Sequence, residues 1–236
     1  MAALAGSAAL IAMFSLRCAR HRNPLIDPGL FRVRAFTGAS AVTLLFSVSF
    51  GAMLLSVVLW MQEDWGWSAL RTGLAIAPGP VMVPVMSFLV TGRLIARFGA
   101  SRVVAAGSTV FAAGVTWWVL SIRLIPNYGD MVGGLLLSGI AVGLTLPTLM
   151  STAAASLPPQ SFATGSGVVT MLRQVGYAIG VAVLVAVLGA PVTAAGRLTA
   201  FRHGWIVIAA VALAGAVAAV LLRRSPAAAA TAATAP

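Results

Sequence analysis

Charged side chains are scarce in this sequence, so one that lies inside an apolar stretch is a candidate for chemistry. Arg173 is such a residue, within a stretch that begins just after Pro159 and ends near residue 190. If the whole stretch is one membrane helix, Arg173 lies roughly 20 Å along its axis and needs water, a helix carbonyl or an anionic group as its partner. If the span is instead 174–190, Arg173 extends to the membrane interface. Gln174 points to another face, where packing is the simpler role.

Glycine and proline positions in the apolar stretches form a second set of candidates, for helix contact and bending. Gly176 and Gly180 lie four residues apart on one helix face, a spacing that lets two membrane helices approach closely. Packing is the simpler interpretation, and a contact that moves is the functional one. Pro147 interrupts another stretch, where it removes a backbone donor and bends the helix. We take these three residues, with Arg173 and Gln174, as candidate cavity or gating residues.

Three arginines and two glycines gather in the short stretch TGRLIARFGASRVV, residues 91–104. They are Arg93, Arg97 and Arg102, with Gly92 and Gly99. Glycine lets a backbone turn tightly, and arginine can bond the exposed carbonyls at a helix C-terminus, which carries partial negative charge. Taken alone, the stretch therefore predicts a basic turn between two membrane helices.

The elements that position these candidates are membrane helices, because the composition excludes a water-soluble fold. Of the 236 residues, 60% are hydrophobic and only 8% are charged, and the mean hydropathy is +1.02. Soluble domains usually carry about 25% charged residues. The sequence therefore predicts an all-α integral membrane protein that lies in a lipid bilayer.

Charge and residue usage also exclude several functions. The net charge is +11 and every basic residue is an arginine, but the arginines lie at the ends of apolar runs and not in a patch with aromatics, so we expect no nucleic-acid partner. A single cysteine, Cys18, excludes an internal disulfide and a multi-cysteine metal site. His21 and His203 are far apart, so we expect no metal and no cofactor. The spans lack the clusters of His, Asp, Glu or Cys that catalysis needs, and an enzyme is not expected.

About seven helices are expected, since about 20 apolar residues cross a bilayer. Six stretches qualify or nearly do: 36–60, 72–91, 103–122, 131–150, a segment ending near 190, and 205–222. Residues 1–16 form a shorter seventh run, which we interpret as a membrane helix shortened by where the chain starts. Residues 223–236 are of low complexity, and we expect a disordered tail.

Arginine counts predict the orientation of these helices. If the spans alternate, ten arginines lie on the side of loop 17–35, loop 92–102 and the tail, and four lie on the other side. The positive-inside rule then places the first side in the cytoplasm, with the N-terminus outside and the C-terminus inside. All six tryptophans fall near outer ends in this topology, as expected of residues that favour the membrane interface. They are Trp60, Trp65, Trp67, Trp117, Trp118 and Trp205.

Three segments, taken in order, resemble the major facilitator superfamily. The stretch from residue 92 resembles its signature loop, roughly G-x-L-x-D-R-x-G-R-R: Gly92, Leu94, Arg97 and Gly99 match, and Ala96 replaces the acid. The segment 23–36, NPLIDPGLFRVRAF, is similar to the basic connector after the eighth helix of the fourteen-span drug:proton antiporters. The segment 157–183 resembles the penultimate helix, where a P-P turn leads to R-Q-x-G-x-x-x-G. The missing acid fits the degraded second copy of the motif, and it removes the charge pairing in which Arg97 would take part.

The resemblance implies a C-terminal transporter half with one linker helix before it. On this basis residues 1–16 are a partial linker helix, 17–35 a basic cytoplasmic connector, 36–222 the six-helix half, and 223–236 a cytoplasmic tail. The implied function is proton-coupled efflux of drugs or other amphipathic small molecules across the inner (plasma) membrane by alternating access. The implied partner is an N-terminal transporter half that this chain lacks. The alternative is an accessory half-transporter that has no activity of its own and pairs with another membrane subunit.

Overall fold

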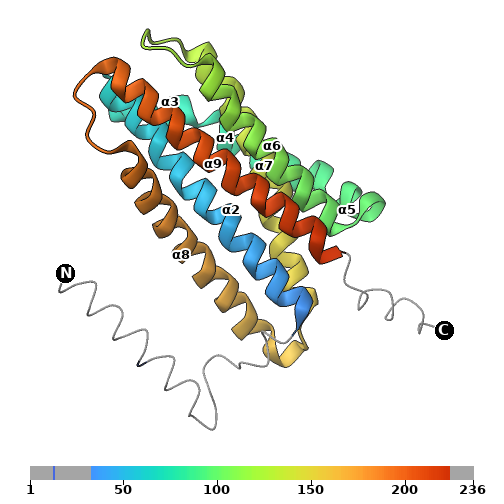
Figure 1. Ribbon diagram of the computed structural model, residues 1–236. Helices are drawn as coiled ribbons and strands as arrows, with labels where there is room; N and C mark the ends of the chain where they lie inside the picture. Colours follow the sequence, from blue (N-terminus) through green and yellow to red (C-terminus); the bar gives the residue numbers. More distant parts are fainter. Residues whose placement is uncertain (1–12, 14–32, 224–236) are drawn as a thin grey trace.

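The computed structural model describes Met13 and residues 33–223, which form a bundle of long helices (Figure 1). Within this part of the chain there is no β-strand, and six helical segments are long and apolar enough to cross a membrane. These segments are Arg34–Asp64, Ala69–Phe98, Ala100–Ser121, Tyr128–Ala155, Phe162–Leu188 and Ala194–Leu221. The expected all-α membrane fold is confirmed. Apart from Met13, the predicted helix at 1–16 lies outside the described residues, as do most of the connector 17–35 and the tail after Arg223.

Two of the six segments combine α-helix with the wider π-helix. Four segments are single helices: α6 (Ala100–Ser121), α7 (Tyr128–Ala155), α8 (Phe162–Leu188, preceded by the 3-10 turn η4, Pro159–Ser161) and α9 (Ala194–Arg223). The first segment consists of α2 (Arg34–Leu59) and η2 (Trp60–Asp64). The second consists of α3 (Ala69–Ile76), α4 (Pro78–Val85), η3 (Met86–Thr91) and α5 (Gly92–Phe98). Pro78, Pro80 and Pro84 each remove a backbone donor from this second segment, so its hydrogen bonding departs from a regular α-helix.

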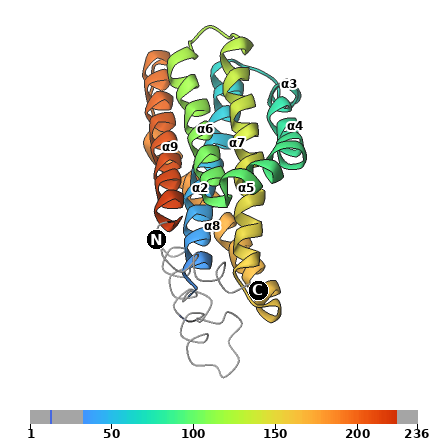
Figure 2. The same cartoon turned by 90° about the vertical axis from the view of Figure 1, so that its right-hand side faces the viewer.

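Helix α2 is the element around which the bundle is arranged, because it packs against α7, α8 and α9. Helices α6 and α7 pack against each other, and α9 lies along both α2 and α6 (Figure 1). Helix α4 packs on α7, and Figure 2 shows α3 and α4 together on one side of the bundle. Helix α8 flanks α2 at the edge away from α6 (Figure 1). The second and fifth spans are therefore the lateral elements of this chain.

Tryptophans gather at one end of the bundle, but most are not the interfacial belt that the sequence suggested. Five of them are buried: Trp60, Trp65, Trp67, Trp118 and Trp205. The Trp205 ring lies between those of Trp60 and Trp118, with centroid distances of 5.8 and 6.1 Å. Trp117 alone is well exposed, at 48%. These rings pack the ends of α2, α6 and α9 together, which places those ends on one side of the bundle.

The last span begins earlier than the sequence suggested. We expected 205–222, because Arg197 and Arg202 interrupt the apolar run, but α9 already begins at Ala194. Both arginines have a polar partner in the bundle, although Arg202 Nε is buried without a partner among the described residues. Arg197 Nε lies 2.7 Å from Asp64 Oδ1, and Arg202 donates to the carbonyl oxygen of Ile122 at 3.3 Å. Charge near a helix end therefore did not stop the helix, because partners in η2 and directly after α6 lie within reach.

Candidate functional site

The stretch at 91–104 is two helices separated by one residue, and not the loop 92–102 that the sequence suggested. Helix α5 continues through Phe98, and α6 begins at Ala100. Gly99 has φ +84°, a backbone conformation that side chains disfavour, so the expected turn at this glycine is confirmed. Gly92 is an ordinary helical residue with φ −60°, and the turn expected there is wrong.

The arginines of this stretch are exposed and make only local contacts. Arg93 donates to the carbonyl oxygen of Leu89 at 3.1 Å, and the Arg97 guanidinium lies 5.4 Å from the Phe98 ring centroid. Arg102 is exposed at the start of α6, and Leu94 is half-buried. Within residues 33–223, no carboxylate lies within ion-pair distance of Arg97 or Arg102. The described half therefore supplies no acid for this motif, as the substitution at Ala96 implies.

Gly176 and Gly180 form the contact between α8 and α2. A Cβ on Gly176 would lie 2.6 Å from Ser47 Cβ and 3.0 Å from the Leu44 carbonyl oxygen. A Cβ on Gly180 would overlap the carbonyl group of Val48. The small-residue spacing therefore brings the two helix backbones into contact.

Pro147 leaves one backbone carbonyl of α7 without its helical donor, and the second span supplies donors for it. Helix α7 continues through Pro147, which cannot donate to the carbonyl of Gly143 one turn earlier. The hydroxyls of Ser87 and Thr91 donate to that Gly143 oxygen instead, each at 3.2 Å. Both donors belong to η3. Two hydrogen bonds therefore hold the π-helical part of the second span to α7, at the residue four positions before Pro147.

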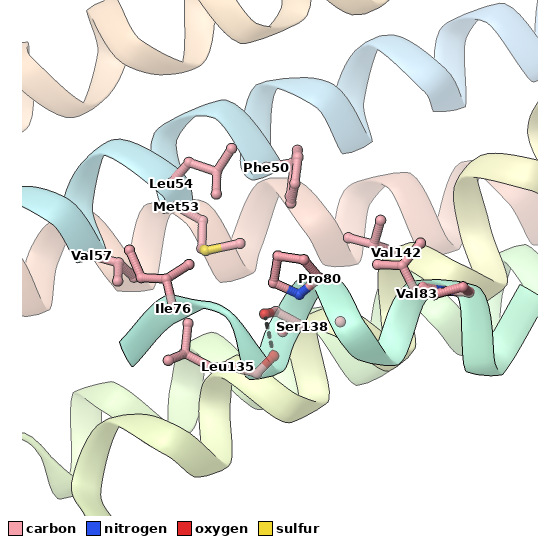
Figure 3. A pocket seen from close by; sticks show the side chains of 13 residues that line it. Phe50, Met53, Leu54, Val57, Ile76, Pro80, Val83, Leu135, Ser138 and Val142 are labelled. Carbon is pink, nitrogen blue, oxygen red and sulfur yellow. Dashed lines mark hydrogen bonds between the residues drawn. The ribbon is translucent and has the colours of Figure 1, made fainter. Parts of the chain in front are cut away.

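A cavity of about 310 Å³ lies between α2, α7 and the α3–α4 region (Figure 3). Its lining comprises Phe50, Met53, Leu54, Val57, Ile76, Gly79, Pro80, Val83, Pro84, Leu135, Ser138, Gly139 and Val142. The one hydroxyl among them, on Ser138, donates to the Leu135 carbonyl oxygen at 2.8 Å, as the dashed line in Figure 3 shows. The cavity is therefore apolar and carries no charged side chain.

Arg173 lies near the middle of α8, about 17 Å from its first residue Phe162 at 1.5 Å per residue. The helix itself is therefore longer than 174–190, and the depth of Arg173 in the membrane stays a prediction. Arg173 is half-buried and donates from Nη2 to the Tyr177 hydroxyl oxygen at 3.2 Å. Its Nε is buried and has no hydrogen-bond partner within the described part of the chain. Gln174 is exposed in the described part of the chain, and its packing role stays a prediction.

The sequence did not identify the residues that link Arg173 to the cavity. The Tyr177 ring lies 5.9 Å from the ring of Phe50, and Phe50 lines the cavity. Tyr177 could have been found from its spacing of four residues after Arg173, which places both on one helix face. The apolar lining carried no such signal, because any helix in this sequence offers similar side chains.

Comparison with known proteins agrees with this architecture. The family model described as Major Facilitator Superfamily matches residues 40–236. The chain is 33% identical over 193 residues to a protein of Streptomyces coelicolor named "Probable actinorhodin transporter", an alignment that covers 77% of this chain and 32% of that protein. It is 29% identical to the "Cephamycin export protein CmcT" of Amycolatopsis lactamdurans, over 84% of this chain and 41% of that one. It is 28% identical to the "Multidrug export protein EmrB" of Escherichia coli, over 68% of this chain and 31% of that one.

The chain thus spans about a third of the length of these curated relatives, and the part that it spans contains six packed helices. The family match covers most of its residues, and the resemblance seen in the signature stretch and in the penultimate helix falls within the match. This chain belongs to the major facilitator superfamily.

Proposed function

We propose that this chain is the C-terminal half of a secondary exporter of amphipathic small molecules, and that a first half completes the transport path. The relatives named "Probable actinorhodin transporter" and "Multidrug export protein EmrB" are about three times as long as their aligned part. In this superfamily the two halves rock around a site near the membrane midplane. The apolar cavity and Arg173 lie beside α2, and we assign them to this half's wall of that site. We place the protein in the inner (plasma) membrane.

The uneven burial of the spans is the observation that carries the proposal. In their most apolar windows, only 6% of residues are buried in Ala69–Phe98 and 17% in Phe162–Leu188, against 44–61% in the other four spans. These two poorly buried spans are the lateral elements: Phe162–Leu188 packs on α2, and Ala69–Phe98 packs on α7. Helix α8 also carries Arg173 and Gln174, which are not fully buried, and such side chains seldom face lipid. A second body of protein or a water-filled cavity on this side satisfies them.

Proton coupling belongs to the first half in this proposal. The acids in the described part of the chain are Glu63, Asp64 and Asp130, and all three lie at helix ends. None is placed within the middle of a span, where a carboxylate could take up and release protons. This half supplies a wall of the substrate path, and an embedded acid must come from its partner.

Export of fluorescent amphipathic dyes, cationic and anionic, tests the function. Cells that lack related transporters would express this chain alone, or together with a first half from an exporter of this family. We expect dye export only when both halves are present, because residues 33–223 provide one wall of the path and no acid in the middle of a span, which cannot run the cycle. Dye export by the chain alone that collapses with the proton gradient would contradict the proposal.

Cysteine labelling tests the proposed orientation, with residue 98 in the cytoplasm. In a Cys18→Ser background, we expect Phe98→Cys to react with an impermeant maleimide only after permeabilisation. Ile125→Cys, in the exposed loop between α6 and α7, is the matched control and should react in intact cells. Labelling of residue 98 in intact cells would overturn the topology.

A further inference from the structure

We propose that the face formed by Arg173, Tyr177 and the adjoining cavity binds an aromatic substrate through an anionic group, and so takes amphipathic acids in preference to amphipathic cations. The inference rests on the proposed export function and names its substrate class.

The first support is an arginine whose charge has no acidic partner among residues 33–223. Arg173 lies near the middle of α8, and in this part of the chain it has one hydrogen-bond partner, the neutral Tyr177 hydroxyl. Within the same residues its buried Nε has no partner, and no carboxylate lies within ion-pair distance. A partly buried guanidinium is stabilised by an anion that can accept two parallel N–H bonds, such as a carboxylate or sulfonate.

The second support is the continuity between this cation and the cavity. The Arg173 Cζ lies 6.0 Å from the centroid of the Tyr177 ring, and that ring lies 5.9 Å from the ring of Phe50. Close approach of the helices fixes this arrangement, because a Cβ on Gly51 would lie 2.7 Å from Tyr177 Cα. In Figure 3, Phe50 projects from α2 beside the other lining side chains. Arg173 and Tyr177 are not among the residues that line the cavity, so in this proposal a molecule bonded to the guanidinium extends along the rings of Tyr177 and Phe50 toward the cavity.

The third support is the character of the cavity. Its volume of about 310 Å³ is twice that of an engineered apolar cavity of about 150 Å³ that binds benzene, so it has room for a fused system of two or three rings. No acid lines it, and the Ser138 hydroxyl is already bonded to Leu135. A cationic headgroup would meet Arg173 and find no counter-charge, whereas an anionic one would find its partner.

Binding of two probes with the same rings and opposite charges tests the inference on the 236-residue chain. The probes are anthracene-sulfonate and anthracenylmethyl-trimethylammonium, titrated into nanodiscs of phosphatidylcholine, with empty nanodiscs subtracted. We expect the sulfonate to bind at least about tenfold more tightly than the ammonium, as one charge-assisted pair allows. Arg173→Gln should weaken sulfonate binding about tenfold and leave ammonium binding equal or stronger, because the repelling charge is removed. Tyr177→Phe, which keeps the ring, should act in the same direction but less.

Arg123→Gln is the matched control, because it removes the same charge from an exposed loop residue away from the cavity. It should leave both affinities unchanged. Equal loss of both probes in Arg173→Gln would show a packing role and overturn the inference. A preference for the ammonium, or no binding of either probe, would also overturn it. The binding outcomes test the substrate class only, and the dye assay tests the export function. If the paired halves exported cationic dyes but not anionic ones, the export function would stand and the proposed substrate class would be rejected.

Discussion

Gly180→Ala is expected to prevent α8 from reaching its native contact with α2, and so to destabilise the bundle strongly. The added methyl group would overlap the Val48 carbonyl group, which is backbone inside a helix and cannot turn aside as a side chain can. Overpacking usually costs about 1–3 kcal/mol, and we expect at least about 3 kcal/mol here because two helices must separate along their length. Thermal unfolding of the purified chain in detergent, followed by tryptophan fluorescence, would measure the loss.

Gly167→Ala on the same helix is the matched control, because nothing lies within 4 Å of a Cβ at that position. Here the substitution should stabilise by about 0.5–1 kcal/mol, since alanine loses less backbone freedom in a helix than glycine does. The two alanines therefore act in opposite directions on one helix. A similar unfolding temperature for both variants would mean that α2 and α8 lie farther apart at Gly180 than the structure describes.

The helices could be predicted because hydropathy is averaged over many residues, so that one exceptional residue does not change the result. Hydropathy over about 20 residues identified all six described spans, and no single residue decided any of them. Boundaries depended on particular residues and were less accurate. Helix α9 begins eleven residues before the expected start of the last span at residue 205, because Arg197 and Arg202 are helical residues and not loop charges. Only the folded bundle brings Asp64 and the Ile122 carbonyl to them.

Glycine and proline were informative where they act through the backbone. Gly99 was predicted to turn the chain, and its φ of +84° confirms this. Pro147 was predicted to remove a backbone donor, and the carbonyl that it frees accepts a hydrogen bond from a neighbouring segment. The identity of that neighbour, Ser87 together with Thr91, depends on which helices pack together. Sequence spacing within one helix could not give it.

The tryptophans show why residue preference alone misleads. An interfacial belt and a buried aromatic cluster have the same sequence signature, namely tryptophans near the ends of spans. The helix ends of α2, α6 and α9 converge, so Trp60, Trp118 and Trp205 meet one another and not lipid. The apolar cavity is a similar case, because its lining is defined by a gap between helices and not by residue type.

Arg197→Gln is expected to destabilise the chain more than Asp64→Asn, although the two side chains form one ion pair. The Asp64 side chain is 4% exposed and that of Arg197 is 40% exposed. Asp64 Oδ2 has no hydrogen-bond partner in the described residues, so Arg197 is the main compensation for this carboxylate. Removing Arg197 leaves a buried charge without a partner, which costs about 3 kcal/mol.

Asp64→Asn instead leaves an arginine that water can solvate, and we expect a loss of about 1 kcal/mol. The double variant should be close to Asp64→Asn alone, because the amide no longer needs a cation beside it; a double-mutant cycle of unfolding temperatures in detergent gives this coupling. Arg123→Gln, an exposed arginine without an ion pair, should stay within about 0.5 kcal/mol of the unmodified chain. The opposite order, with Asp64→Asn the more damaging, would mean that the carboxylate supports something besides Arg197. The end of α2 would then be held to α9 by a contact other than this ion pair.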